Sequence, residues 1–434
     1  MSKKTITIHI SENEYSNNSN SPLNVLLSRL EGLKKDIEET QEQTQELERN
    51  RDQYIIHLLQ CQEDNNILTN IYKKLKLKYD IETYSEKNPE QSLQPAEPIS
   101  IEVMEIEPQI ATNSDTPSNL VLNLRYAMNT SSIICTAQFS HNGKCIAFAG
   151  PHSIYMLNAD DGELLYTIEL PQISNSSESD HTKCIKFSPD DRYLAATRSE
   201  TSIILYEVNL NSPIQNHNEK KPIVHIFGEG GHEKGVNSIV FSKDGKRMIT
   251  AGYDGILVVW DMTTFDIIKR INHQELELPD PMITGLSTSV DNSIYALGFV
   301  SGILGIYDEH ISQSMVQFPT DQKQIMGISI SQNDHSYIAT SSTTNVKIWE
   351  VKLIAQLKKE LVGHTDFVLA SEFSINHPLI FTGSKDKTIK IWDIRTGKLL
   401  MDVLAHNNTV FQISHDPTKS SFVSCSGDGI VCVW

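Results

Sequence analysis

The stretch that decides the fold spans residues 363–393 and reads GHTDFVLASEFSINHPLIFTGSKDKTIKIWD. Two further segments, at 231–261 and 405–434, share its texture of short apolar runs broken by turn residues. The three segments place a His, a Thr or Ser, an Asp and a Trp at successive intervals of 18, 4 and 6 residues: His364, Thr382, Asp386 and Trp392; His232, Thr250, Asp254 and Trp260; His406, Ser424, Asp428 and Trp434. Such repetition within one chain indicates a repeated structural unit.

These four residue types resemble the hydrogen-bonded relay of WD-repeat blades. In such blades the Asp stands in the turn between the second and third strands, and the hydroxyl links the His to the indole N–H of the Trp. The same residue types could form a catalytic triad, but an enzyme rarely carries three copies of a nucleophile site. The spacing therefore favours a structural role.

Counting between the ends of the expected third strands gives seven blades. These ends fall at Leu157, Tyr206, Trp260, Tyr307, Trp349, Trp392 and Trp434, at intervals of 49, 54, 47, 42, 43 and 42 residues. The period of a WD repeat is about 40–45 residues. Four blades depart from the relay, because Pro151, Glu200, Ser301 and Thr343 stand where its Asp would be. The sequence thus predicts an all-β, seven-bladed WD-repeat propeller at 119–434.

The last segment ends on a third strand, so the seventh blade needs an outer strand from elsewhere. The alternating run NLVLNLRY at 119–126 precedes the first blade and has no other assignment. We expect it to close the ring and cover an exposed edge.

A long α-helical coiled coil is predicted before the propeller, over 21–85. Ser21 and Pro22 form a plausible helix start. Apolar residues then follow in alternating steps of three and four, which indicates a left-handed coiled coil and a homo-oligomer. The oligomerisation seam includes Leu23, Leu26, Leu30, Leu33, Ile37, Leu47, Leu58, Leu68 and Leu75. Polar seam positions such as Arg51 and Asn65 either fix the register or mark a weaker segment. Residues 1–20 are predicted to be disordered, and 86–118 to be an acidic, Pro-containing linker. Its stretch IEVMEIEP at 101–108 alternates apolar and acidic residues, which is compatible with a short docking strand, but a disordered spacer is favoured.

Composition and motifs argue against several functions. The net charge of −18 opposes direct binding to DNA, and no run of about 18 apolar residues predicts a membrane span. No phosphate-binding loop, metal motif or nucleophile elbow occurs, so no enzyme activity and no cofactor are expected. Lys358 and Lys359 are too short a run for a basic patch. Composition does not choose between cytoplasm and nucleus.

The loops around the relays are the expected partner-binding face of the propeller. They carry Lys234, Tyr253, Thr365, Asp366, Phe367, Lys385, Lys387 and Asn408. Exposed aromatic residues are frequent interface anchors. Phe367 could serve as one, or it could begin a strand and be buried.

GHTDFVLA, followed by TGSKDKTIKIWD, is similar to the Groucho/TUP transcriptional corepressors of the fungal TUP type, and the layout of helix, linker and propeller is similar too. The resemblance implies a nuclear corepressor scaffold, a tetramer through the helix, that binds a tetratricopeptide-repeat adaptor. It also implies that DNA-bound transcription factors dock on the propeller and that the linker contacts histone tails, although this linker is much shorter. The alternative is a cytoplasmic coiled-coil/WD-repeat scaffold of the autophagy-conjugation or signalling type.

Overall fold

The computed structural model describes most of the chain beyond residue 101. The described residues are 102–104, 106–118, 120–130, 132–171, 182–198, 201–208, 223–228, 230–275, 278, 280–289, 291, 293–308, 315–332, 337–351 and 355–434. All of them belong to one compact unit, Glu97–Trp434. The predicted disordered segment 1–20 and coiled coil 21–85, with its whole seam, lie outside the described residues.

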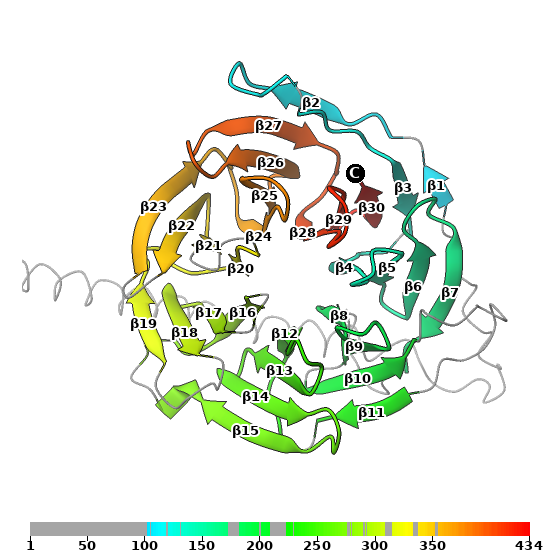
Figure 1. The fold of residues 1–434 in the computed structure, drawn as a ribbon, viewed down its shortest axis with the longest axis vertical. Helices are drawn as coiled ribbons and strands as arrows, with labels where there is room; N and C mark the ends of the chain where they lie inside the picture. Colours follow the sequence, from blue (N-terminus) through cyan, green and yellow to red (C-terminus); the bar gives the residue numbers. More distant parts are fainter. Residues whose placement is uncertain are drawn as a thin grey trace, which may run out of the picture. The chain divides into compact units, whose positions relative to one another are not determined.

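Seven antiparallel sheets are arranged around a ring, with β4, β8, β12, β16, β20, β24 and β28 innermost (Figure 1). Blade 1 contains β4 (Thr136–Phe139), β5 (Cys145–Ala149), β6 (Ser153–Asn158) and β7 (Leu164–Glu169). Blade 2 contains β8 (Ile185–Phe187), β9 (Tyr193–Arg198), β10 (Ser202–Glu207) and β11 (Ile223–Phe227). Blade 3 contains β12 (Val236–Phe241), β13 (Arg247–Gly252), β14 (Ile256–Asp261) and β15 (Ile267–Asn272).

The remaining blades follow the same order along the chain. Blade 4 contains β16 (Ile283–Thr288), β17 (Ile294–Phe299), β18 (Ile303–Asp308) and β19 (Val316–Pro319). Blade 5 contains β20 (Gly327–Ile330), β21 (Tyr337–Ser341), β22 (Asn345–Val351) and β23 (Ala355–Val362). Blade 6 contains β24 (Val368–Phe373), β25 (Leu379–Ser384), β26 (Thr388–Asp393) and β27 (Leu399–Leu404). Blade 7 contains β28 (Val410–His415), β29 (Phe422–Ser426) and β30 (Ile430–Val433). The helix among the described residues is a short 3-10 turn, η1 (His273–Glu275).

The core lies between the blades and not in the centre of the ring. The two middle strands of each blade are buried on both faces, as in β25, where all six residues are buried. A strand covered on both faces reads as a continuous apolar run instead of an alternating one. This explains runs such as ILVVW in β14 and SIILY in β10. The predicted seven-bladed propeller is confirmed.

The strand that closes the ring lies later in the chain than the predicted 119–126. β3 (Tyr126–Asn129) pairs antiparallel with β30, with Tyr126 opposite Val433 and Asn129 opposite Ile430. Before β3, Leu122 and Leu124 pack against the buried cluster of blades 6 and 7 without forming a strand. Their alternation therefore reports side-chain packing, and the sheet hydrogen bonds begin only where Arg125 N–H meets the Val433 carbonyl at 2.8 Å.

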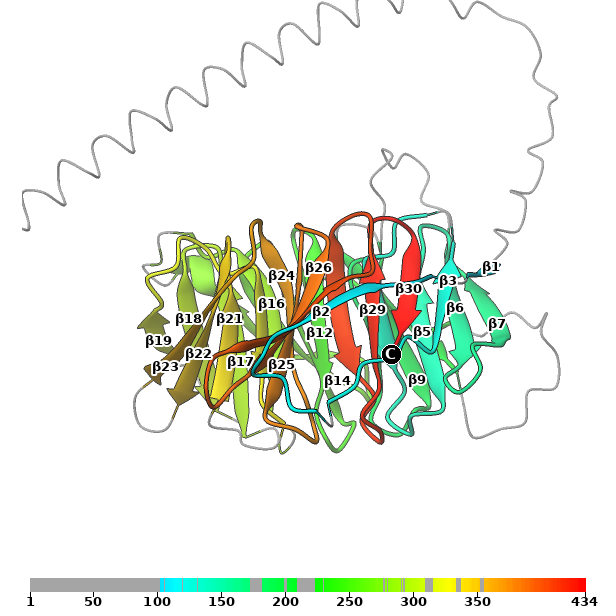
Figure 2. The same cartoon turned by 90° about the horizontal axis from the view of Figure 1, so that it is seen from above.

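The predicted linker 86–118 is not simply a spacer, because part of it forms two strands on the propeller. β1 (Glu102–Met104) pairs with β3, and β2 (Gln109–Thr112) pairs with β27. Both extend a blade outward as a fifth strand, and β2 is seen crossing the outside of blade 6 (Figure 2). Outer edges of this propeller can therefore accept an additional antiparallel strand.

Candidate functional site

In blade 3 the four repeated residue types form one chain of hydrogen bonds. The Trp260 indole Nε1 donates to Thr250 Oγ1 at 3.0 Å, and Thr250 Oγ1 lies 2.8 Å from His232 Nε2. His232 Nδ1 lies 3.1 Å from Asp254 Oδ2. Since a carboxylate only accepts, a neutral imidazole must carry its proton on Nδ1 and accept from the Thr hydroxyl at Nε2. Donation thus runs in one direction, from Trp through Thr and His to Asp.

Blade 6 repeats this arrangement with shorter contacts. Trp392 Nε1 donates to Thr382 Oγ1 at 2.9 Å, and Thr382 Oγ1 lies 2.7 Å from His364 Nε2. His364 Nδ1 lies 2.7 Å from Asp386 Oδ2. The Thr382 hydroxyl is fully buried, so no substrate can reach it as a nucleophile. The geometry is that of an internal tether and not of a triad open to solvent.

Blade 7 has a looser version of the relay. Trp434 Nε1 donates to Ser424 Oγ at 3.1 Å, and His406 Nε2 lies 2.9 Å from the same oxygen. His406 Nδ1, however, is 3.4 Å from Asp428 Oδ2. The carboxylate instead accepts the Asn407 backbone N–H at 2.6 Å. In this blade the Asp holds the loop mainly through the backbone.

The relay carboxylates are held in their charged form. Burial alone would raise the pKa of Asp386, but the hydrogen bond and charge interaction with His364, together with the Thr388 hydroxyl, hold that pKa well below its usual range. The pKa values of Asp254 and Asp428 are also lowered. Burial is outweighed at Asp254 by the hydrogen bond and charge of His232, and at Asp428 by the charge of His406 and the Asn407 and Ile430 backbone N–H groups. A fixed negative charge therefore sits under each of these three loops.

Two blades replace the relay with other residues that the sequence analysis missed. In blade 5 Trp349 Nε1 donates to Thr340 Oγ1 at 2.9 Å, and Thr340 donates to Gln322 Oε1 at 2.7 Å. In blade 4 His273 Nε2 lies 2.9 Å from the Tyr307 hydroxyl. Gln322 precedes Thr340 by the same 18 residues that separate His and Thr elsewhere, and this spacing was the available signal.

Each relay brings two loops of its blade together. The turn after the second strand bonds back to the loop before the first strand, through Tyr253 N–H to Gly235 O and Lys385 N–H to Phe367 O, at 2.9 and 2.8 Å. The eight predicted face residues lie in these loops. Five of them are exposed: Lys234, Thr365, Lys385, Lys387 and Asn408. The other three are half-buried: Tyr253, Asp366 and Phe367.

The predicted face is divided into two groups. Blade 3 lies across the ring from blades 6 and 7, so Lys234 and Tyr253 are separated from the other six residues (Figure 1). Tyr253 instead meets Lys183 of blade 2, whose Nζ lies 4.7 Å from the ring centroid. We call the second group the blade 6–7 patch; it comprises Thr365, Asp366, Phe367, Lys385, Lys387 and Asn408.

Within the blade 6–7 patch, Phe367 is half-buried and its ring contacts a lysine. Lys385 Nζ stands 5.5 Å from its ring centroid and 3.7 Å from an Asp366 carboxylate oxygen. Lys387 has a φ of 74°, in the left-handed region, where Gly255, Gly302 and Gly429 stand at the matching positions of blades 3, 4 and 7. A side chain kept at a strained turn is a frequent mark of a functional surface.

Among the residues that the structure describes, no group of three His, Cys, Asp or Glu side chains could hold a metal ion. Within those ranges, no helix has the length and apolar character needed to cross a membrane.

Comparison with known proteins supports the fold. The repeat family described as WD domain, G-beta repeat, matches residues 222–261, 355–393 and 397–434. Apoptotic protease-activating factor 1 of Rattus norvegicus is 26% identical over 257 residues, which cover 56% of this chain and 19% of that protein. A ribosome biogenesis protein WDR12 homolog of Drosophila pseudoobscura pseudoobscura is 27% identical over 218 residues, covering 47% of this chain and 52% of that protein. The chain thus spans from about a fifth to half of the length of these relatives.

These relatives overturn the resemblance to Groucho/TUP corepressors. Their names refer to ribosome biogenesis and to apoptotic protease activation, and not to transcriptional repression. The assignment as a corepressor was wrong because the segments on which it rested, at 363–370 and 382–393, lie in a loop, strands and a turn that any WD repeat needs. The adaptor, transcription-factor and histone partners were inferred only from that resemblance, so they lose their support with it. The chain therefore contains a seven-bladed WD-repeat β-propeller.

Proposed function

We propose that this chain is a non-enzymatic protein-binding scaffold, and that the blade 6–7 patch is a docking surface for a partner protein. The observation that carries the proposal is Lys387, which keeps a side chain at a φ of 74° where three other blades use Gly. The left-handed conformation costs a non-Gly residue about 1 kcal/mol or more. A residue that weakens the fold while pointing a charge outward is explained by binding.

The rigidity of the patch supports the same proposal. The buried His364–Asp386 pair, at 2.7 Å, fixes the two loops that carry Phe367 and Lys387. Loops that are ordered before binding lose less conformational entropy on association. Lys385 lies beside the half-buried Phe367 ring, and Lys387 is exposed in the same turn, so the surface suits a partner with an apolar anchor and carboxylates beside it.

The experiment is quantitative affinity capture with the full chain and matched variants. Lys387→Gly should raise stability by about 1 kcal/mol, because Gly relieves the turn, and should lose bound partners. Phe367→Ala should lose the same partners. Lys269→Glu, on β15 of blade 3, is the control and should capture the wild-type set. The proposal fails if both patch variants capture the same proteins as the wild type.

The coiled coil at 21–85, the linker that follows it and the propeller from residue 119 remain our proposal for the domain organisation. The unbroken seam supports a homo-oligomer. The test is sedimentation of the full chain with Leu26→Asp and Leu30→Asp together, which should convert an oligomer into a monomer. An unchanged mass would refute the seam. A nuclear location stays a prediction.

A further inference from the structure

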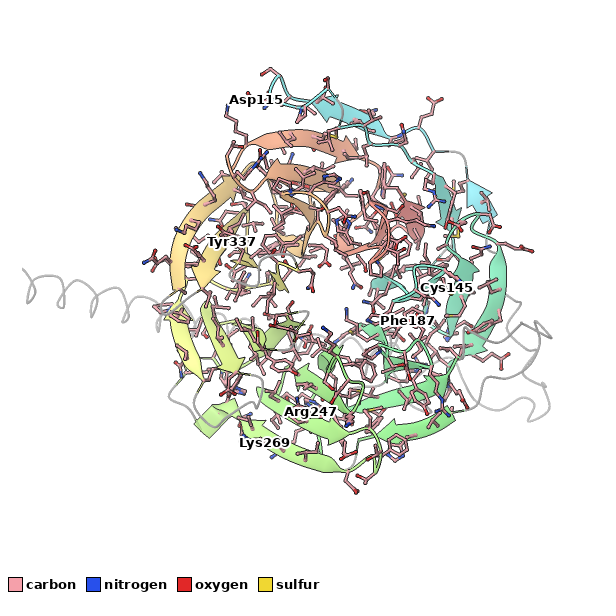
Figure 3. The ribbon with its side chains drawn as sticks, in the orientation of Figure 1. Asp115, Cys145, Phe187, Arg247, Lys269 and Tyr337 are labelled. Atoms are coloured by element: carbon pink, nitrogen blue, oxygen red, sulfur yellow. The ribbon has the colours of Figure 1, made fainter. Side chains whose placement is uncertain are left out.

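A pocket of about 590 Å³ opens between blades 5 and 6. It is lined by Lys358 and Lys359 of β23, by His377 and Ser374 of the β24–β25 turn, by Arg395 of the β26–β27 turn, and by Tyr337 of β21, which Figure 3 labels. In the part of the chain that the structure describes, no Asp or Glu lines this pocket. In a chain with a net charge of −18, a pocket lined by two lysines, an arginine and a histidine is a marked local reversal.

A β-bulge places both lysines on the pocket. Consecutive strand residues normally point to opposite faces. In blade 5, however, Ile348 is opposite Lys359 and Trp349 is opposite Leu357, so Lys358 is an extra residue in the register. A bulge of this kind redirects a side chain.

The other bulged blades show that the lysine pair is particular to blade 5. The register shifts at the same place between the third and fourth strands of blades 1, 2, 3 and 6. The two residues that correspond to Lys358 and Lys359 are there Leu165 and Tyr166, Val224 and His225, Ile268 and Lys269, and Leu400 and Met401. The bulge is a feature of the fold, whereas the pair of charges is not required by it.

The ammonium group of Lys359 can bind an anionic ligand. Lys358 pairs with Glu350 at 2.5 Å and Arg395 with Asp393 at 3.3 Å, but Lys359 makes no ion pair within the described ranges. Its side chain reaches the neighbouring blade, where its Cδ would lie 3.2 Å from a Cβ added at Gly397. Lys359 therefore spans the junction between the two blades.

Ser374 adds a hydroxyl donor to the pocket. In blades 1 to 4 the serine after the first strand donates to the Asn or Asp two residues later, as Ser140 does to Asn142 at 2.8 Å and Ser242 to Asp244 at 2.6 Å. Ser374 has Asn376 at that place, yet its hydroxyl makes no hydrogen bond to another described residue. It is only 5% exposed and lines the pocket. Its Oγ is not among the buried atoms that lack a partner, so the hydroxyl is accessible from the pocket and can donate to a ligand there.

We propose that this pocket binds the phosphate of a phosphorylated, extended peptide segment from a partner protein. A phosphomonoester carries close to two negative charges and three acceptor oxygens. Lys359, the Arg395 guanidinium and the Ser374 hydroxyl provide the matching donors. The outer edge of β23 borders the pocket, and the chain itself adds strands to the corresponding edges of blades 6 and 7. That precedent and the net charge of −18, which repels an anionic membrane, favour a peptide over a lipid headgroup.

The pocket is distinct from the blade 6–7 patch. In antiparallel blade 6 the β24–β25 and β26–β27 turns lie at one end, and the β25–β26 turn with Lys387 lies at the other. Binding at the pocket therefore does not rest on the proposed function of the patch, and each can fail without the other.

The test is fluorescence anisotropy of the full chain with three labelled pools of degenerate heptapeptides, carrying phosphoserine, serine or glutamate at the centre. The phosphoserine pool should bind at least about tenfold more tightly than the serine pool, since hydrogen bonds to charged groups contribute about 1.5–3 kcal/mol. Inorganic phosphate should compete.

Variants localise the binding. Lys359→Gln and Arg395→Gln should each weaken binding about tenfold or more, whereas Lys269→Gln, the corresponding position in blade 3, and Lys387→Gly should not. Thermal unfolding verifies that each variant is folded. Equal binding of the phosphoserine and serine pools, or equal affinity of the Lys359 and Lys269 variants, would overturn the proposal. So would binding to phosphoinositide vesicles without binding to the phosphoserine pool.

Discussion

Replacement of Thr382 by Val is the sharpest test of how the relay stabilises the propeller. Valine has nearly the shape of threonine but lacks the hydroxyl, which accepts from Trp392 Nε1 at 2.9 Å and lies 2.7 Å from His364 Nε2. Thr382 is fully buried and Trp392 is 2% exposed, so water cannot replace the lost partner. An unsatisfied buried polar group costs about 1–3 kcal/mol, and two groups are affected. We expect a loss of about 3 kcal/mol in the free energy of unfolding.

Equilibrium urea unfolding followed by circular dichroism measures this loss without depending on tryptophan fluorescence. Thr396→Val, in the exposed β26–β27 turn of the same blade, is the matched control and should change stability by less than about 0.5 kcal/mol. Trp392→Phe removes the indole donor, so Thr382→Val should cost about 1–2 kcal/mol less in that background. Additive losses in the double variant would show that the hydroxyl and the indole do not interact, and would refute the relay as a hydrogen-bonded unit.

Three further predictions concern ring closure and pH. Gly162→Ala should lower stability by about 1–3 kcal/mol in thermal unfolding, because φ at Gly162 is 77° and an added Cβ would lie 2.9 Å from the Tyr126 ring of the closing strand; an unchanged midpoint would contradict that close approach. Burial lowers the pKa of His415 to about 4, against about 6.5 in the unfolded chain, so the unfolded state binds the proton first and stability should fall from pH 6.5 to 4. His415→Gln should flatten that part of the pH profile, and a profile identical to the wild type would disprove the assignment. The pKa of Asp386 is lowered on folding, so its contribution should be complete above about pH 4 and lost below it; Asp386→Asn should reduce the acid dependence only there.

The fold could be predicted from the sequence wherever a blade needs particular chemistry. A buried indole needs an acceptor, and in blades 3, 6 and 7 the Thr or Ser and the His that satisfy it stand at fixed intervals. Blade 5 satisfies the same need differently, through the Gln322–Thr340–Trp349 chain. Blade 4 has Tyr307 in place of the Trp, and its hydroxyl contacts His273. Because these two blades use other residue types in the same place, the spacing of His and Asp did not reveal their hydrogen bonds.

The closing strand and the pocket could not be predicted from the sequence, for a different reason. Leu122 and Leu124 alternate because they pack on blades 6 and 7, and packing produces the same alternation as pairing in a sheet. Lys358 and Lys359 look like a short, solvated run until Arg395 is brought beside them from the next blade. A site that is assembled across a blade junction leaves no continuous motif, so only the three-dimensional structure reveals it.

The two proposed surfaces should bind their partners independently, although both use blade 6. The strands between them are six residues long, which separates the two ends of the blade by about 20 Å. Every residue of β25 is buried, and interiors packed in this way resist continuous deformation. Coupling between distant sites requires an element with two alternative arrangements, and a strand fixed on both faces offers none. Lys387→Gly should therefore leave phosphopeptide affinity unchanged, and Lys359→Gln should leave capture at the patch unchanged. Independent sites at opposite ends of one rigid blade would allow this propeller to hold two partners at once, which is what a scaffold must do.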